Sequence, residues 1–262
     1  MRKKPRKSFV MIGTGNLAIH LTKALLKNFS LLQVIGTQPK STKKFATQFG
    51  ATCTNDVSEI NVKADVYFIC VPDDQIEQVA KNLLLDRKLV LHCSGSTEME
   101  ILQECSENFG VMYPLYTFSA MDTKVDFKKI PIFVEGSNTE SEFMVKEIAR
   151  SLSSTVKPLN SVQRKKLHLA AVFSSNFSNY LFDLAHQYLE AENLDKFNDL
   201  LPLMEKSISK LHEMTPRQAQ TGPAKRKDKR VISNHLKMLE KYPEHHKIYS
   251  LVSKLIFKRT YN

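Results

Sequence analysis

The chain lacks the cysteine pattern of a disulfide-stapled or zinc-binding protein. Four cysteines occur among 262 residues, with no C-x-x-C pair: Cys53, Cys70, Cys93 and Cys105. Disulfide frameworks and structural zinc sites need cysteines at short, repeated spacings. We therefore predict reduced thiols and no metal site.

Long apolar runs are also missing. No run approaches the roughly 20 apolar residues that a membrane-spanning helix requires. The N-terminus, MRKKPRK, is basic, but the apolar segment after it is too short for the core of a signal peptide. We expect a cytoplasmic protein without membrane association. Its length allows one large or two moderate domains with a buried core.

The charge is unbalanced toward the positive side, with a formal net charge of +11. Five basic residues lie in the first seven positions, and smaller basic clusters lie at 163–166 and 224–230. Aromatic residues, which alternate with basic ones on single-strand nucleic-acid surfaces, are not interleaved in these clusters. Solvated faces or attraction to an anionic cofactor explain them better, so nucleic acid is the less favoured partner.

The first 158 residues alternate between short apolar strands and helices. This alternation predicts an α/β fold with a doubly wound parallel sheet, as in Rossmann-like domains. The expected strands are 9–12, 31–36, 51–53, 65–71, 88–92, 110–113, 130–134 and 155–158. The expected helices are 15–28, 41–49, 75–84, 97–107 and 139–152.

The pattern becomes all-helical after Pro158. No Gly or Pro interrupts residues 161–192, which predict one long helix. Further helices are expected at 197–213, 226–240 and 249–257. We therefore predict two domains, a cofactor domain over 1–158 and an all-α domain over 159–262.

A glycine-rich turn follows the first strand. It reads Gly13-Thr14-Gly15-Asn16-Leu17-Ala18, the G-x-G-x-x-A form of the dinucleotide fingerprint. A glycine at position 15 lets a diphosphate approach the backbone, and the N–H groups that start the next helix face that phosphate. We predict that these six residues bind a dinucleotide. A tight strand–helix turn without a ligand is the alternative.

The end of the second strand indicates which dinucleotide is bound. NAD-binding domains place an acidic residue there for the ribose 2′-hydroxyl, and this chain has none. Hydroxyl, amide and lysine side chains stand in its place, in the segment that contains Thr37, Gln38, Lys40, Ser41, Lys43 and Lys44. These groups suit a 2′-phosphate, so NADP is favoured over NAD. The alternative is that the lysines form a solvated helix face.

Three loops at strand ends are candidates for the rest of the site, because ligands of open α/β sheets bind outside the carboxyl ends of the strands. Val71, Pro72 and Asp73, after the fourth strand, are expected to leave room for the nicotinamide half of the cofactor to pass. Ser94 and Gly95 offer a hydroxyl and backbone N–H groups to an anionic substrate. Pro114, in the loop 113–118, is a further substrate-binding candidate.

The long helix carries a polar stripe. Its members are spaced 3, 4, 4 and 3 residues apart: Lys165, His168, Val172, Asn176 and Asn179. In a regular helix they share one face, which forms either a satisfied helix–helix seam or one wall of a polar cleft. In the second case His168 exchanges the proton that accompanies hydride transfer. Asn176 would hold the carbonyl or imine, and Lys165 is the third catalytic candidate.

Together these segments resemble a bacterial family that combines a Rossmann-like domain with a helical domain of unknown function. The resemblance rests on the glycine turn, Val71-Pro72-Asp73, 92–96, 113–118, 167–171 with Ser175-Asn176, and Thr221-Gly222-Pro223 with Arg226 and Asp228. The family is similar to the deazaflavin-dependent NADP oxidoreductase and pyrroline-5-carboxylate reductase group. Two positions depart from its pattern: Tyr113 replaces a His, and Lys227 replaces a Gly.

The resemblance implies a helical domain like the C-terminal domain of 6-phosphogluconate dehydrogenase, which often dimerises, and a site between the two domains. Arg226 is then expected to reach the substrate, although a helix cap followed by a solvated basic run explains that segment equally well. We predict an NADP-dependent oxidoreductase that acts on a small, anionic carbonyl or imine compound. The alternative is an NADP-binding sensor or scaffold without catalysis.

Overall fold

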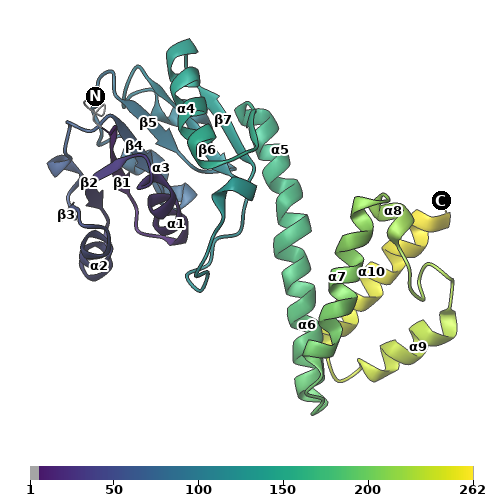
Figure 1. Cartoon of the computed structure of the whole chain (residues 1–262). Coiled ribbons are helices and arrows are strands. Elements are labelled where there is room, and N and C mark those ends of the chain that lie inside the picture. Colours follow the sequence, from purple (N-terminus) through teal and green to yellow (C-terminus); the bar gives the residue numbers. More distant parts are fainter. Residues whose placement is uncertain (1–5, 262) are drawn as a thin grey trace. The chain divides into compact units, whose positions relative to one another are not determined.

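The computed structural model describes residues 6–261 (Figure 1). Of the basic N-terminus at 1–7, residues 1–5 lie outside this range. The chain forms two compact units that divide between Ser175 and Asn176, and each unit is described here by itself. The predicted boundary at residue 158 falls at the end of the last strand. The division of roles that it implied remains a prediction.

The first unit is built around one eight-stranded sheet, in the order β3-β2-β1-β4-β5-β6-β7-β8. The first six strands have the order 3-2-1-4-5-6 of dinucleotide-binding domains, with the switch point between β1 and β4. The strands are β1 Ser8–Ile12, β2 Ser30–Ile35, β3 Thr52–Thr54, β4 Val66–Ile69, β5 Leu89–His92, β6 Phe109–Pro114, β7 Ile132–Gly136 and β8 Val156–Pro158. The predicted Rossmann-like fold is confirmed.

Helices cover both faces of this sheet, because alternate strand residues point to opposite faces. In β1, Phe9 and Met11 join the core under α1, α2 and α4, while Val10 and Ile12 join the core under α3. All four strand side chains are at most 2% exposed. The helices of this unit are α1 Asn16–Leu25, α2 Pro39–Phe49, α3 Asp73–Ala80, α4 Thr139–Leu152 and α5 Ser161–Ala171. Short 3₁₀ turns lie at Val57–Glu59, Met99–Leu102 and Phe127–Lys129.

The sequence had predicted a parallel sheet, but one pair of strands in the observed sheet is antiparallel. Strand β7 pairs antiparallel with β6, whereas the other neighbouring pairs are parallel. Parallel neighbours need a long crossover, usually a helix. The connection 115–131 contains only the 3₁₀ turn Phe127–Lys129. The chain therefore returns along β6 in the opposite direction.

The helix predicted over 97–107 is wrong. Only the 3₁₀ turn Met99–Leu102 forms there. The backbone beyond it pairs with the segment before β5: Leu85 N donates to Cys105 O at 2.8 Å, and Glu107 N donates to Asp86 O at 2.9 Å. These tertiary hydrogen bonds replace the i→i+4 ladder that a longer helix would need.

The long helix predicted over 161–192 is interrupted. Helix α5 is followed by a π-helical segment, Val172–Asn176, and then by α6 Phe177–Ala191. A π turn places i+5 residues, not i+4 residues, in register. The spacing that put Asn176 and Asn179 on the face of His168 therefore does not hold in this segment.

The second unit is helical, as predicted. After α6 it contains α7 Leu201–Ser209, α8 Pro216–Ala219, α9 Lys229–Met238 and α10 Pro243–Tyr261, with 3₁₀ turns at Phe197–Leu200 and Lys210–His212. Among its described side chains, the only buried apolar ones are Leu184 and Ala224. Within residues 6–261 no helix has the length and apolarity to cross a membrane.

Candidate functional site

The glycine turn begins at the carboxyl end of β1, and Gly13 is fixed there by sterics. Its φ of +113° lies in the region that residues with side chains rarely adopt, and a Cβ would lie 2.2 Å from the carbonyl oxygen of Cys70, the residue after β4. Gly13 N also donates to Ile35 O at 2.8 Å. Glycine is thus needed at this position by the fold itself, with or without a ligand.

Gly15 has a different environment. Its φ is −73°, which any residue can adopt, and no atom lies within 4 Å of an added Cβ. Gly15 caps α1, whose first turn has no acidic residue and no side-chain cap. The first N–H groups of a helix have no intrahelical acceptor. Open space over a helix start with these donors fits a diphosphate.

The end of β2 presents the residues predicted to select the cofactor. Thr37, Gln38, Lys40 and Ser41 are all exposed. They surround the start of α2, which again has no acidic residue in its first turn and no side-chain cap. Thr42 fixes this turn, since its hydroxyl donates to Gln38 O at 2.8 Å. A second helix start with basic neighbours suits a phosphate monoester.

The loops after β4 and β5 are joined to each other. Asp73, which opens α3 after Val71 and Pro72, accepts a hydrogen bond from the Ser96 hydroxyl. The Ser94 hydroxyl is used inside its own loop: it donates to Thr97 Oγ1 and accepts from Ser96 N and Thr97 N, all at 3.0 Å. Ser94 therefore shapes the loop, and its predicted contact with substrate remains a prediction.

A tyrosine and a histidine meet over this loop. The Tyr113 hydroxyl at the end of β6 lies 2.9 Å from Nδ1 of His168 in α5. A Cβ on Gly95 would lie 2.5 Å from the same nitrogen, so the ring packs directly on the glycine. Burial, together with the Asp73 charge, raises the pKa of Tyr113, so the phenol stays protonated at neutral pH. Pro114, the next residue, is buried in the sheet opposite Ile132.

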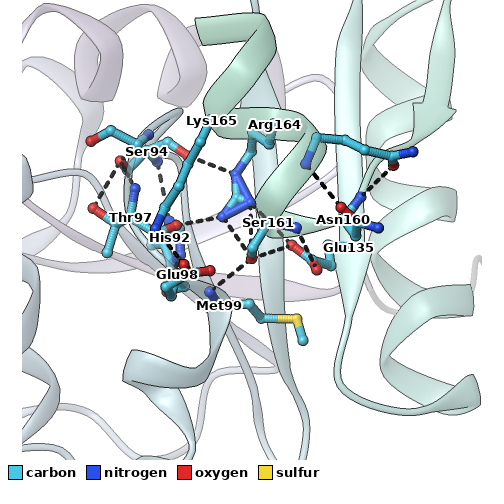
Figure 2. Close-up of polar contacts among 12 residues, drawn as sticks. His92, Ser94, Thr97, Glu98, Met99, Glu135, Asn160, Ser161, Arg164 and Lys165 are labelled. Carbon is cyan, nitrogen blue, oxygen red and sulfur yellow. Dashed lines mark hydrogen bonds and ion pairs between the residues drawn. The ribbon is translucent and has the colours of Figure 1, made fainter. Parts of the chain in front are cut away.

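Two residues of this region had no role in the sequence analysis. Tyr113 had been noted only as a departure from a family histidine. Arg164 lies one helical turn before His168 and is fully buried. Its position in a run of basic residues gave no sign of this burial. Figure 2 shows Arg164 among the loop 94–98 and Glu135. Lys165 points to the outer side of that loop, where its amine pairs with Glu98.

The loop after β6 joins the glycine turn to α5. Asn16 Nδ2 donates to Phe118 O at 3.2 Å, and His20 Nε2 lies 2.9 Å from Ser119 O. The Thr117 hydroxyl lies 3.1 Å from that of Ser175 in the π segment. The first unit therefore brings together the glycine turn, the loops after β4, β5 and β6, and His168.

Asn176 and Arg226 belong to the second unit. Asn176 ends the π segment, and Arg226 is an exposed residue of the turn before α9. Asp228 caps α9 by accepting from Val231 N at 3.0 Å, which agrees with the helix-cap interpretation of this segment. The substrate contacts of Asn176 and Arg226 remain predictions.

Comparisons with known families match both parts of the chain. Residues 8–95 match the family described as NADP oxidoreductase coenzyme F420-dependent. Residues 130–256 match a domain of unknown function, DUF2520. No curated protein matches the sequence.

Three solved structures resemble this one over nearly the whole chain. A putative NADP oxidoreductase from Bacteroides fragilis is 40% identical, with a TM-score of 0.90 over 97% of this chain and 98% of that one. A protein from Thermotoga maritima is 24% identical, with a TM-score of 0.79 over 97% and 100%. A reductive aminase from Aspergillus terreus, in complex with NADPH and ethyl levulinate, is 14% identical, with a TM-score of 0.72 over 97% and 93%.

Proposed function

The chain belongs to the same family as the putative NADP oxidoreductase from Bacteroides fragilis, and we propose that it is an NADP-dependent oxidoreductase. Its substrate would be a small carbonyl or imine compound. One observation supports the proposal: the open glycine turn after β1 and the Tyr113–His168 pair after β6 lie at the same edge of one sheet.

NADP fits the residues at this edge. The diphosphate would lie at the start of α1, in the space that a side chain at Gly15 would fill. The 2′-phosphate would lie at the start of α2, beside Gln38, Lys40 and Ser41. No carboxylate in the first turn of either helix repels these groups. When bound, the nicotinamide ring supplies or accepts the hydride.

The protein's own contribution would be proton exchange at His168. The Tyr113 hydroxyl engages Nδ1, so Nε2 is the ring nitrogen that would exchange a proton with the carbonyl oxygen or imine nitrogen of a substrate. The phenol is held protonated by burial and orients the imidazole. Positioned acid–base groups of this kind contribute typically 10²- to 10⁴-fold to a rate.

We also propose that the second unit forms a homodimer interface. Helix α7 has no buried residue. It exposes large apolar side chains to water, which is unfavourable, among them Leu201, Leu203 and Ile208. Exposed apolar faces of this extent mark interaction surfaces. A second copy of the chain supplies a matching apolar face.

The test is a pair of measurements on the full chain. Thermal stability is compared with saturating NADP and NAD, because the preferred ligand raises stability more by mass action. NADPH oxidation is then followed with a panel of keto acids and imines. We expect stabilisation by NADP above NAD and turnover of at least one substrate, which is lost in His168→Ala. Tight NADPH binding without turnover across the panel would instead favour a sensor or scaffold.

A further inference from the structure

Arg164 has the largest fully buried side chain among residues 6–261. Removing a guanidinium from water is costly unless its charge and its donors are satisfied. Each of its three nitrogens has an acceptor within hydrogen-bond distance. Nε donates to Ser94 O at 3.2 Å, Nη1 donates to Glu135 Oε2 at 3.0 Å, and Nη2 donates to Thr97 O. The Ser161 hydroxyl completes the set at 3.3 and 3.1 Å from the two terminal nitrogens.

The acceptors reveal what this cluster holds in place. Two of them, Ser94 O and Thr97 O, are backbone carbonyls on either side of Gly95, in the loop that ends β5 (Figure 2). The planar fork of an arginine can fix several acceptors at once, which a lysine cannot. Arg164 therefore fixes the distance and angle between this loop and α5.

The other end of the cluster fixes the start of α5. Glu135 of β7 accepts from both Ser161 N and Ser161 Oγ at 2.8 Å. Met99 N donates to the same hydroxyl at 3.1 Å. Glu135 thus compensates the buried charge and anchors the first turn of the helix to the sheet. The helix cannot slide along the loop without breaking these bonds.

His168 lies one turn after Arg164, on the same face of α5. Its ring contacts Gly95 closely enough that a single methyl group would overlap Nδ1, and that same atom meets the Tyr113 hydroxyl at 2.9 Å. A small shift of the loop relative to α5 would therefore separate the two rings.

We infer that Arg164 is a positioning residue, which holds the loop at Gly95 against α5 so that His168 meets Tyr113. The inference rests on the proposed function for the proton exchange at His168. The positioning of His168 by Arg164 does not depend on it. A buried ion pair is weak grounds for stability and is better attested as a device for specifying one arrangement. Here the arrangement is that of the proposed proton-exchanging group.

The experiment compares Arg164→Lys with wild type. Lysine keeps the charge beside Glu135 but has a point-like ammonium in place of the fork. We expect kcat to fall by about 10- to 100-fold, as small misplacements of catalytic groups do, with KM and NADPH affinity within about twofold of wild type. Circular dichroism confirms folding. Ser161→Ala, which removes a hydroxyl bound to both terminal nitrogens, should move kcat in the same direction.

A second readout does not depend on turnover. In protein labelled with ¹⁵N-histidine, the Nδ1 signal of His168 is assigned with His168→Gln, and Tyr113→Phe shows the shift that follows loss of the hydroxyl. We expect Arg164→Lys and Ser161→Ala to move the signal toward the Tyr113→Phe value. Glu107→Gln is the matched control, because it removes one carboxylate charge from an exposed pair with Arg87 in the same unit and should leave the signal unchanged.

The outcomes separate the two proposals. An unchanged His168 signal in both Arg164→Lys and Ser161→Ala overturns the inference, whatever the activity. If Arg164→Lys does not fold, Ser161→Ala decides alone. If wild type binds NADPH but turns over no substrate, the proposed function fails, while the spectroscopic arm still decides whether Arg164 positions His168.

Discussion

Tyr113 and His168 are 55 positions apart in the sequence, and their side chains are 2.9 Å apart between the hydroxyl and Nδ1. The contact joins the end of β6 to the last turn of α5, two elements of one compact unit. Gly95 lies against the same imidazole. Tyr113, where the resemblance implies a histidine, is thus a group that can hydrogen-bond to His168.

The first prediction concerns this pair. Tyr113→Phe removes one hydroxyl and leaves the ring in place, so the fold should be kept while His168 loses its partner. We expect kcat to fall by roughly 10-fold, and His168→Ala to lower it by about 10²- to 10⁴-fold, the range for general acid–base groups. NADPH oxidation with the best substrate of the panel measures both. Tyr116→Phe, at an exposed tyrosine three residues on, is the control. Equal rates for Tyr113→Phe and wild type would remove Tyr113 from the mechanism.

The second prediction separates the two glycines of the turn. Gly13→Ala combines a φ of +113° with a collision at Cys70 O, and such backbone strain alone costs of order 1–3 kcal/mol. Its melting temperature should fall by several degrees. Gly15→Ala meets no protein atom, so its melting temperature without ligand should match wild type.

Ligand binding should reveal an effect of Gly15→Ala that its melting temperature without ligand does not show. A methyl group at Gly15 occupies the space proposed for the diphosphate, and we expect NADPH affinity to fall by at least 10-fold, about 1.4 kcal/mol. Fluorescence titration with NADPH measures this loss. Wild-type affinity in Gly15→Ala would show that the diphosphate lies elsewhere.

The third prediction concerns the choice between NADP and NAD. Gln38→Asp places at the end of β2 the acidic residue that serves the ribose 2′-hydroxyl in NAD-binding domains, and its charge repels a 2′-phosphate. We expect weaker NADPH binding, with NADH affinity unchanged or improved. Lys40→Ala should weaken NADPH binding alone. Lys63→Ala, which removes an exposed lysine from another surface, controls for net charge. Equal losses for both nucleotides in Lys40→Ala would contradict the proposed 2′-phosphate site.

The fourth prediction follows from His92. Burial, with a smaller contribution from the Arg164 charge, lowers its pKa from 6.5 to about 4. Its hydrogen bonds suit the neutral ring, since Nδ1 accepts from Ser94 N at 3.2 Å while Nε2 faces Glu98 O at 3.2 Å. Between pH 6.5 and 4 the unfolded chain binds a proton here that the folded chain does not. Stability contributed by the neutral ring is therefore lost as the pH falls through this window.

The size of this effect can be measured by urea unfolding. From pH 7 to pH 5 the free energy of unfolding should fall by about 2 kcal/mol on account of His92. His92→Gln keeps a donor toward Glu98 O but does not titrate, so its loss over the same interval should be smaller by that amount. Parallel pH profiles for the two proteins would show that His92 titrates normally.

The fifth prediction concerns the dimer. Leu203→Glu and Leu211→Glu each replace an apolar side chain with a charged one. The two leucines are 66% and 48% exposed in the single chain. If a second copy covers them, each charge is buried without a partner, and the dimer should dissociate. Light scattering after size-exclusion chromatography should give twice the chain mass for wild type and the chain mass for the variants. Leu84→Glu, at an 85% exposed leucine of the first unit, is the control. A wild-type monomer at high concentration would refute the dimer.

The sequence was sufficient for features that local chemistry specifies. Apolar runs such as Val66–Ile69 form buried strands because only a covered sheet accepts them. The glycine turn lies where the fingerprint placed it, since Gly13 is the residue that its φ and its contact with Cys70 require. Helix starts with clear caps were also predictable, such as α4 behind Asn138.

Features that depend on distant partners could not be read from the sequence. The sequence pattern did not indicate the antiparallel pairing of β7 with β6, the short 3₁₀ turn at Met99–Leu102 or the π segment at Val172–Asn176. Lys165 and Arg164 are adjacent basic residues of one helix, yet the first is half-buried in a surface pair and the second is wholly enclosed. Sequence chemistry determined the fold class and the glycine turn, because these depend on neighbours in the chain. The tertiary structure decided which arginine is buried and which tyrosine meets His168, because those contacts join residues that only folding brings within hydrogen-bond distance.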